Sequence, residues 1–281
     1  MLDDRVVLDA TVGQSMPMVS LHLCMLGCEE EPPYGPTHHT GTMFLDLLTQ
    51  AAAHDSVSLS IKITIYRIQQ FDYPESYAEF DGVLIPGSFS SAYDTDAWIL
   101  RLKEVIREDL WAQRIPTMGV CFGHQILAHA FEGGMASKCP SGLQAGIRSF
   151  GIQPGSGFGS HEHGELSLNL MYTHGDAVES LPLMAKSLGG TPEVPILGAV
   201  YYCSDNVPVF CTFQAHPEYA SEGPKQPTLR TSLLQMEERG AIANHSLHMK
   251  QVEERWDHVY RDSVLVMVTT CRMLKWFPSK A

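Results

Sequence analysis

Apolar residues recur along the chain with two periods, one of two residues and one of three to four. Residues 19–26 and 82–85 are short and almost wholly apolar, which is typical of strands buried on both faces. Residues 58–68 alternate between apolar and polar positions and predict a third strand with one wetter face. Apolar positions three or four apart predict helices that begin at residue 42 and span 97–112.

The second half of the chain continues this alternation of strands and helices. Residues 166–172 predict another strand, and 196–202 with 207–213 predict a hairpin. Residues 228–277 have a helical period with charges on one face, which predicts two or three helices packed on the core or facing a partner. The whole pattern predicts an α/β fold in three layers: an open, mostly parallel sheet with helices on both faces.

The same pattern predicts how the chain divides. We expect an N-terminal lead over 1–17, an α/β domain over 18–225 and a C-terminal helical extension over 226–281 packed on that domain. Within the lead, residues 5–8 are compatible with either a stray strand or a disordered segment. Residues 29–41 are rich in Pro, Gly and His and predict a loop.

Composition narrows the possible partners. The 281 residues carry a net charge of −13 at pH 7, which argues against nucleic acid or an anionic membrane surface as a partner. Seven cysteines, an odd number in a long chain, are not typical of a disulfide framework. The chain has no recognisable signal peptide and no apolar stretch of the roughly 20 residues needed to span a bilayer. We therefore expect a cytosolic protein.

One stretch gives the strongest indication of chemistry. Residues 117–127 run from a short apolar segment through Gly119, Cys121 and Gly123 into an amphipathic segment. That order predicts a strand, a sharp turn and a helix, the cysteine counterpart of a nucleophile elbow. The start of a helix favours the thiolate, which can attack a carbonyl carbon while backbone N–H groups hold the oxyanion. The alternative for Cys121 is a buried cysteine with only a structural role.

A candidate base lies far downstream. The apolar strand 208–215 is followed by His216, Pro217 and Glu218. Because proline disfavours the helical region for the residue before it, we expect His216 to be extended. Side chains two residues apart in an extended chain point the same way, so Glu218 can orient the imidazole. With Cys121, this predicts a nucleophile, a base and an orienting carboxylate, all at strand ends.

Together these motifs resemble the class I glutamine amidotransferase family. The resemblance rests on residues 81–88, 119–125, 173–178 and 216–218 and covers about residues 18–222. In that family the cysteine takes the γ-glutamyl group of glutamine as a thioester and releases ammonia. The resemblance implies a flavodoxin-like sheet, a glutamine or γ-glutamyl substrate and no cofactor.

The resemblance also implies roles for particular residues. The N–H groups of Gly87 and Phe122 would form the oxyanion hole beside the catalytic residues Cys121, His216 and Glu218. The residues that would hold the substrate are Ser88, Gln125, Thr173, His174 and Asp176.

Three segments carry an alternative or a departure from the family pattern. Many members have glycine where Ser88 stands, and serine there resembles the stand-alone branch of the family. Gln144 stands where the family often has Glu, and a neutral amide cannot make the same charge-assisted hydrogen bond. The alternative for residues 173–176 is an ordinary helix-capping turn.

Two groups of residues have the residue types of a metal site. They are Cys24, Cys28, His38 and His39 near the N-terminus, and His161 and His163 in a Gly-rich segment. Neither has a zinc-binding spacing, and Cys24 lies within an apolar strand, so we expect no metal.

Three functions remain open. An amidotransferase would transfer the ammonia to a small acceptor or to a synthetase partner, because the sequence contains no loop that would activate an acceptor with ATP. A γ-glutamyl peptidase would cleave glutathione-type conjugates. The third function is a non-catalytic binding or regulatory role on the same scaffold.

Overall fold

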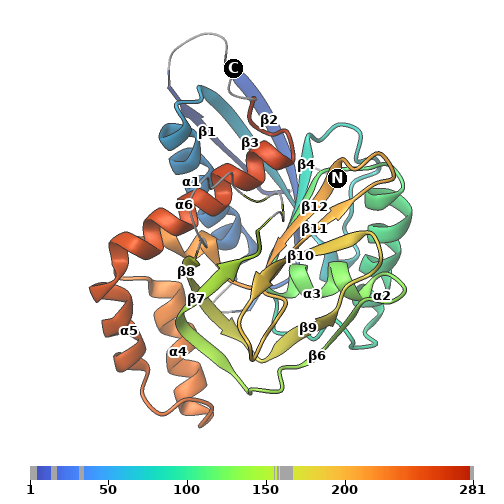
Figure 1. Ribbon diagram of the computed structural model, residues 1–281. Coiled ribbons are helices and arrows are strands. Elements are labelled where there is room, and N and C mark those ends of the chain that lie inside the picture. The colour runs from blue at the N-terminus through green and yellow to red at the C-terminus, as the bar shows by residue number, and fades with distance from the viewer. Residues whose placement is uncertain are drawn as a thin grey trace.

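One large sheet organises the described part of the chain. The computed structural model describes residues 5–13, 18–31, 35–154, 156, 158 and 167–278. Within these ranges ten strands pair in the order β1-β3-β2-β4-β5-β12-β11-β10-β7-β8 (Figure 1). The bounds of these strands are β1 Val7–Val12, β2 Val19–Gly27, β3 Leu59–Arg67, β4 Gly82–Ile85, β5 Thr117–Val120, β7 Gln144–Ile152, β8 Ser167–His174, β10 Ala185–Gly190, β11 Gly198–Tyr202 and β12 Pro208–Phe213.

The centre of this sheet is parallel. Strands β3, β2, β4, β5 and β12 run in one direction, and Leu84 of β4 pairs with Met25 of β2 and Met118 of β5. Antiparallel strands extend the core at both ends, with β1 beside β3 and the other four beyond β12. The predicted α/β fold, with a mostly parallel core sheet and C-terminal helices, is confirmed.

Helices cover both faces of the parallel core (Figure 1). Leu23 of β2 belongs to the hydrophobic core beneath α1 and α6, whereas the next residue, Cys24, belongs to the core beneath α2 and α3. Because both faces are buried, the strand is apolar along its length instead of alternating. The helix bounds are α1 Thr37–Asp55, α2 Ala97–Val105, α3 Phe122–His129 and α6 Trp256–Met273. A π-helical turn, Ile106–Trp111, continues α2, so the helix predicted over 97–112 is present.

Two predictions about the first third of the chain need correction or completion. Helix α1 begins at Thr37, so the loop predicted over 29–41 ends earlier and the helix does not begin at residue 42. Gly41 lies inside this helix and does not break it. A Cβ at this position would lie 2.6 Å from the Ile65 side chain of β3, so glycine lets the helix pack closely on the strand. Residues 7–12 form an edge strand. Of the two alternatives for this part of the N-terminal lead, the strand is therefore correct and the disordered segment is not.

The C-terminal helices pack against the sheet. Helices α4 (Pro227–Glu238) and α5 (His245–Glu254) share a hydrophobic core with β7 and β8, and α6 packs along α1. After α6, the buried Trp276 donates a hydrogen bond from Nε1 to the Asp81 carbonyl at 3.1 Å. A Cβ on Gly82 would lie 2.4 Å from that nitrogen, so the indole closely covers the start of β4.

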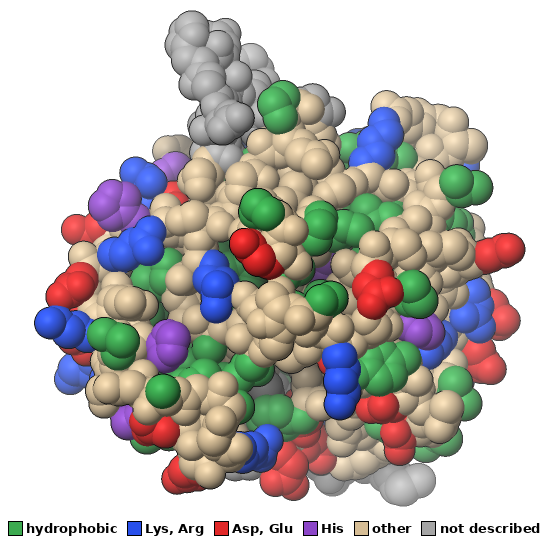
Figure 2. Space-filling model, turned by 60° about the horizontal axis from the view of Figure 1, so that its bottom comes forward, with side chains coloured by type: hydrophobic (Ala, Val, Ile, Leu, Met, Phe, Trp, Pro, Cys, Tyr) green, Lys and Arg blue, Asp and Glu red, His purple; other side chains and the backbone are tan. Residues whose placement is uncertain are grey.

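Two further strands lie outside the large sheet, and the surface carries charges of both signs. Strands β6 (Met135–Lys138) and β9 (Asp176–Ser180) form a separate two-stranded sheet beside α3. On the face shown in Figure 2, acidic and basic side chains are interspersed and do not gather into a basic stripe. None of the helices in the described ranges is long and apolar enough to cross a bilayer.

The anchoring role of Trp276 gives a first prediction. Replacing Trp276 by Ala should lower the free energy of unfolding by about 3–5 kcal/mol, because it removes a large buried side chain and leaves a cavity beside β4. Urea denaturation measures this change. The fully exposed Leu183, replaced by Ala, serves as the control and should change stability little. A loss below about 1 kcal/mol for Trp276→Ala would show that the C-terminal segment is not anchored there.

Candidate active site

The turn between β5 and α3 holds Cys121 in a strained conformation. Its φ of 53° and ψ of −106° are rare for a residue with a side chain, and such strain persists only where surrounding contacts fix it. The Cys121 N–H donates to the Phe213 carbonyl of β12 at 2.8 Å, and the Gln125 N–H donates to the Cys121 carbonyl at 3.1 Å. The structure therefore has the predicted strand, sharp turn and helix at this cysteine.

Close backbone approach explains the two glycines of the turn. A Cβ on Gly123 would lie 2.0 Å from the Ile85 carbonyl oxygen at the end of β4. A Cβ on Gly119 would lie 2.7 Å from the Gly123 carbonyl oxygen. Both distances are far below contact range, so only glycine lets α3 begin this close to β4 and β5.

A buried imidazole–carboxylate pair lies behind the cysteine. His216 Nδ1 and Glu218 Oε1 are 2.7 Å apart, and both side chains are almost completely buried. The ring of Tyr219 stacks on the imidazole, with centroids 4.4 Å apart and planes inclined by 7°. A carboxylate at Glu218 accepts from Nδ1–H and so fixes which imidazole nitrogen carries the proton.

The route by which this pair forms differs from the prediction. The chain does not stay extended through Glu218, because a 3₁₀ helix, Pro217–Glu222, begins directly after His216. Proline occupies the first position of that helix, where its missing N–H costs nothing. The Glu218 carboxylate therefore reaches the His216 ring across a helical turn. The prediction that an extended chain would bring the two side chains together was wrong.

Gly87 shows how near the cysteine and the imidazole are to each other. A Cβ on Gly87 would lie 3.0 Å from His216 Cε1 and 3.6 Å from Cys121 Cβ. Both side chains thus border the same point on the loop after β4. Phe122, the first residue of α3, follows Cys121 directly, and its buried ring packs on Trp98 at 5.6 Å between centroids.

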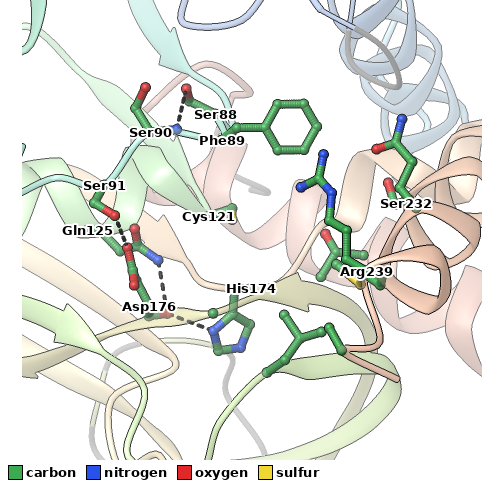
Figure 3. A pocket seen from close by; sticks show the side chains of 16 residues that line it. Ser88, Phe89, Ser90, Ser91, Cys121, Gln125, His174, Asp176, Ser232 and Arg239 are labelled. Carbon is green, nitrogen blue, oxygen red and sulfur yellow. Dashed lines mark hydrogen bonds between the residues drawn. The ribbon is translucent and has the colours of Figure 1, made fainter. Parts of the chain in front are cut away.

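A cavity of about 270 Å³ opens at Cys121 (Figure 3). It is near the lower end of the size range of small-molecule sites. Cys121 is 5% exposed and lines the cavity, whereas His216 and Glu218 are buried and are not among the lining residues. The lining residues that the sequence predicted as substrate-binding are Ser88, Gln125, Thr173, His174 and Asp176.

The side chains around Asp176 form a hydrogen-bonded group. The Asp176 carboxylate accepts from Ser91 Oγ at 2.5 Å and from Tyr93 OH at 3.1 Å. Gln125 Nε2 donates to the Asp176 carbonyl at 3.0 Å and to Gln214 Oε1 at 3.1 Å. Both amide hydrogens of Gln125 are therefore engaged, and its carbonyl oxygen is the group it can offer a ligand.

His174 is neutral in this environment. It ends β8, and Gly175 alone separates it from β9, so the helix-capping alternative for residues 173–176 is wrong. Its Nδ1 donates to the Asp176 carbonyl, 2.7 Å away. Burial lowers the pKa of His174 to about 3, although the hydrogen bond to the Asp176 carbonyl acts in the opposite direction. The ring can thus act as an acceptor through Nε2.

Part of the cavity wall was missed by the sequence analysis. The Ser88 hydroxyl donates a hydrogen bond to Glu29 Oε2 at 3.3 Å, whereas the sequence had placed Glu29 only in a loop. The far wall comes from α4 and the residues after it: Ser232, Gln235, Met236, Arg239 and Ala241. The only signal for these residues was the change to a helical period near residue 228, which carries no information about where the helix packs.

The two candidate metal sites gain no support. Burial raises the pKa of the Cys24 and Cys28 thiols well above its usual value, which disfavours the thiolate that a metal requires. In the part of the chain that the structure describes, no group of three or more His, Cys, Asp or Glu side chains could hold a metal ion. His161 and His163 lie outside the described residues.

Gln144 departs from the family pattern, which often has Glu at this position. Its side-chain amide donates hydrogen bonds to the Ser141 and Gly142 carbonyls.

A thiol on a strained turn beside a buried imidazole–carboxylate pair is the arrangement typical of cysteine hydrolases. Comparison with known proteins shows the family to which the chain belongs. It belongs to the class I glutamine amidotransferase family, since residues 44–236 match the family described as "Glutamine amidotransferase class-I".

Individual relatives agree with this assignment. The Saccharomyces cerevisiae protein "Putative glutamine amidotransferase YLR126C" is 25% identical over 219 residues, which are 75% of this chain and 82% of that protein. Gamma-glutamyl peptidase 5 of Arabidopsis thaliana is 31% identical over 165 residues, which are 56% of this chain and 62% of the peptidase. A glutamine amidotransferase from Thermotoga maritima shares the fold, with a TM-score of 0.65 and 16% identity over 91% of this chain and 98% of that one.

The buried histidine of α3 gives a prediction about pH. Burial lowers the pKa of His124 to about 4, and its Nδ1 lies 2.7 Å from Thr212 Oγ1. Between about pH 6.5 and 4 the unfolded chain binds a proton that the folded chain does not, so stability should fall as the pH falls. For this histidine alone the loss over that window should be about 3 kcal/mol.

Urea denaturation at several pH values measures this dependence. In His124→Asn the slope of the unfolding free energy against pH should fall by up to one proton in that window. Leu183→Ala changes an exposed side chain that cannot titrate, and it should keep the slope of the wild type. An unchanged slope in His124→Asn would contradict the assignment.

Proposed function

We propose that the protein is a cysteine-dependent hydrolase of γ-glutamyl amides, with Cys121 as the nucleophile, His216 as the base and Glu218 as the orienting carboxylate. The observation that carries this proposal is the convergence of Gly87, Cys121 and the buried His216–Glu218 pair on one point at the cavity. Each comes from the carboxyl end of a different parallel strand, where ligands bind in open α/β sheets.

The first step forms a thioester. His216 takes the thiol proton, and the Cys121 sulfur attacks the γ-carbonyl carbon of the substrate. The N–H groups of Gly87 and Phe122 would stabilise the resulting oxyanion. The C–N bond then breaks, and His216 returns the proton to the leaving nitrogen, which departs as ammonia or an amine.

The second step restores the enzyme. A water molecule gives a proton to His216 and adds to the thioester carbon. The C–S bond then breaks, His216 gives the proton to the departing Cys121 sulfur, and glutamate is released. The hydrogen bond from His216 to Glu218 stabilises the imidazolium in both steps. The task of Glu218 is to orient the ring and not to accept its proton.

The acceptor groups around Asp176 would bind the amino-acid end of the substrate. The Asp176 carboxylate and the Gln125 carbonyl oxygen suit an α-ammonium group, and the neutral His174 is a further acceptor. Ser88 and Thr173 lie on the same cavity wall and complete the group of residues assigned to the substrate.

Two fates of the leaving nitrogen are compatible with this chemistry. In an amidotransferase the ammonia would pass to a small acceptor or a synthetase partner in a biosynthetic pathway. In a γ-glutamyl peptidase the leaving group would be an amino acid or peptide. The name of the Arabidopsis thaliana relative and the extension of the cavity towards α4 favour this second candidate. The joint presence of Cys121, His216 and Glu218 argues against a purely non-catalytic role.

The role of the thiol is directly testable. Cys121→Ser should fold normally and lose hydrolysis of both glutamine and γ-glutamyl dipeptides by at least about a thousandfold, because the hydroxyl is a much poorer nucleophile. A glutamine-mimicking alkylator should modify Cys121 in the wild type, as mapped by mass spectrometry. Cys203, which is half-buried and does not line this cavity, gives the matched control Cys203→Ser, which should stay active. Full activity in Cys121→Ser would remove the cysteine from the mechanism.

The role of the carboxylate gives a separate prediction. Glu218→Gln keeps the shape of a side chain that is 1% exposed but cannot hold the imidazolium, so kcat should fall by about 10²–10⁴-fold. Steady-state kinetics on the same substrates measure the change, with circular dichroism as the check on folding. A kcat within about threefold of the wild type would exclude Glu218 as the orienting residue.

A further inference from the structure

The cavity has a cation on the side away from Asp176. Arg239 follows the last residue of α4, and its guanidinium reaches into the cavity, with Cys121 lying between it and Asp176 in Figure 3. Among the described residues that line the cavity, Arg239 is the only Lys or Arg. Within the described ranges Arg239 is exposed to solvent and takes part in none of the salt bridges, whereas Arg230 of α4 is paired with Glu253. An unneutralised guanidinium facing a ligand cavity is a candidate anion-binding group.

The backbone that carries Arg239 is held by hydrogen bonds at the end of α4. The Gly240 N–H donates to the Glu237 carbonyl and the Ala241 N–H to the Met236 carbonyl, both at 2.8 Å. Gly240 has a φ of +69°, the left-handed conformation that this Schellman ending requires. Met236 and Ala241 also line the cavity, so the helix end is itself part of the wall. The partial negative charge of a helix C-terminus further favours a cation there.

The two ends of the cavity therefore differ in the groups that they offer. Near Asp176 the carboxylate, the Gln125 carbonyl and the neutral His174 are all acceptors. At the other end, Arg239 offers only donors, beside the apolar Met236. A substrate that spans the cavity would be matched best by an ammonium group at one end and a carboxylate at the other.

We infer that Arg239 binds a carboxylate on the leaving amine, so that the preferred substrates are γ-glutamyl amino acids or peptides with a free C-terminal carboxylate. This inference rests on the proposed function. The α-ammonium and α-carboxylate of a γ-glutamyl group share one carbon, so binding of the ammonium near Asp176 keeps both at that end. The leaving amine then extends past Cys121 towards α4. Ammonia leaving from glutamine would contact neither Arg239 nor Met236.

The test compares two substrates that differ in one charge. γ-Glutamylglycine carries the C-terminal carboxylate, and γ-glutamylglycinamide replaces it by a neutral amide of nearly the same shape. For the wild type, kcat/KM for the acid should exceed that for the amide by about tenfold or more, as expected for a charge-assisted hydrogen bond. In Arg239→Ala this ratio should fall about tenfold, mainly through a higher KM for the acid. Arg239→Lys keeps the charge and should restore part of the ratio.

A control on the same helix separates this effect from a general change of charge. Arg230 of α4 pairs with Glu253 at 3.6 Å and does not line the cavity. Arg230→Ala removes one positive charge, as Arg239→Ala does, and should keep the ratio of the wild type. Thermal unfolding of all variants verifies that each is folded at the assay temperature.

The outcomes distinguish failure of the inference from failure of the proposed function. An equal loss for both substrates in Arg239→Ala would mean that Arg239 binds the α-carboxylate or supports the structure, and the inference would be wrong. An unchanged ratio would overturn it as well, and in both cases Cys121-dependent hydrolysis would still stand. If the wild type cleaved neither dipeptide nor glutamine, or if Cys121→Ser remained fully active, the proposed function would be wrong and this inference would fall with it.

Discussion

The structure depends on one close backbone contact, that between Gly123 at the start of α3 and the Ile85 carbonyl at the end of β4. This contact sets the distance between the cysteine turn and the loop that carries Gly87. Cys121, two residues before Gly123, adopts a conformation that costs about 1–3 kcal/mol. The parallel ladder of β4, β5 and β12 supplies the contacts that hold the turn in that state, including the hydrogen bond from Cys121 to Phe213.

Burial of the His216–Glu218 pair is a second constraint on the site. Charged groups removed from water are tolerated only when they are paired and hydrogen-bonded, and here the partner is two residues away. Tyr219 stacks on the imidazole from the same 3₁₀ helix. The short segment 216–219 thus provides the imidazole, the carboxylate that is hydrogen-bonded to it and the ring that covers it. Such a compact arrangement fixes the imidazole with little dependence on distant parts of the chain.

Local patterns predicted the parts of the molecule that local forces determine. The strand over 82–85 is apolar because both faces are buried, and the glycines beside Cys121 are required by steric contact, so each leaves a signature in the sequence. The beginning of α1 was missed because Gly41, normally a helix breaker, is needed there for packing on Ile65. The position of Arg239 could not be predicted, since it depends on how α4 packs against strands that are distant in sequence.

The cavity is built from two parts of the chain that have different tasks. Cys121 and the proposed base His216 follow strands β5 and β12 of the parallel sheet, whereas the opposite wall of the cavity lies on α4 and its C-terminal turn. If the proposed chemistry and the proposed choice of leaving group are carried by these separate elements, mutations in one can accumulate without disturbing the other. A scaffold of this kind can acquire new substrates by altering a single surface-mounted helix while its reaction stays the same.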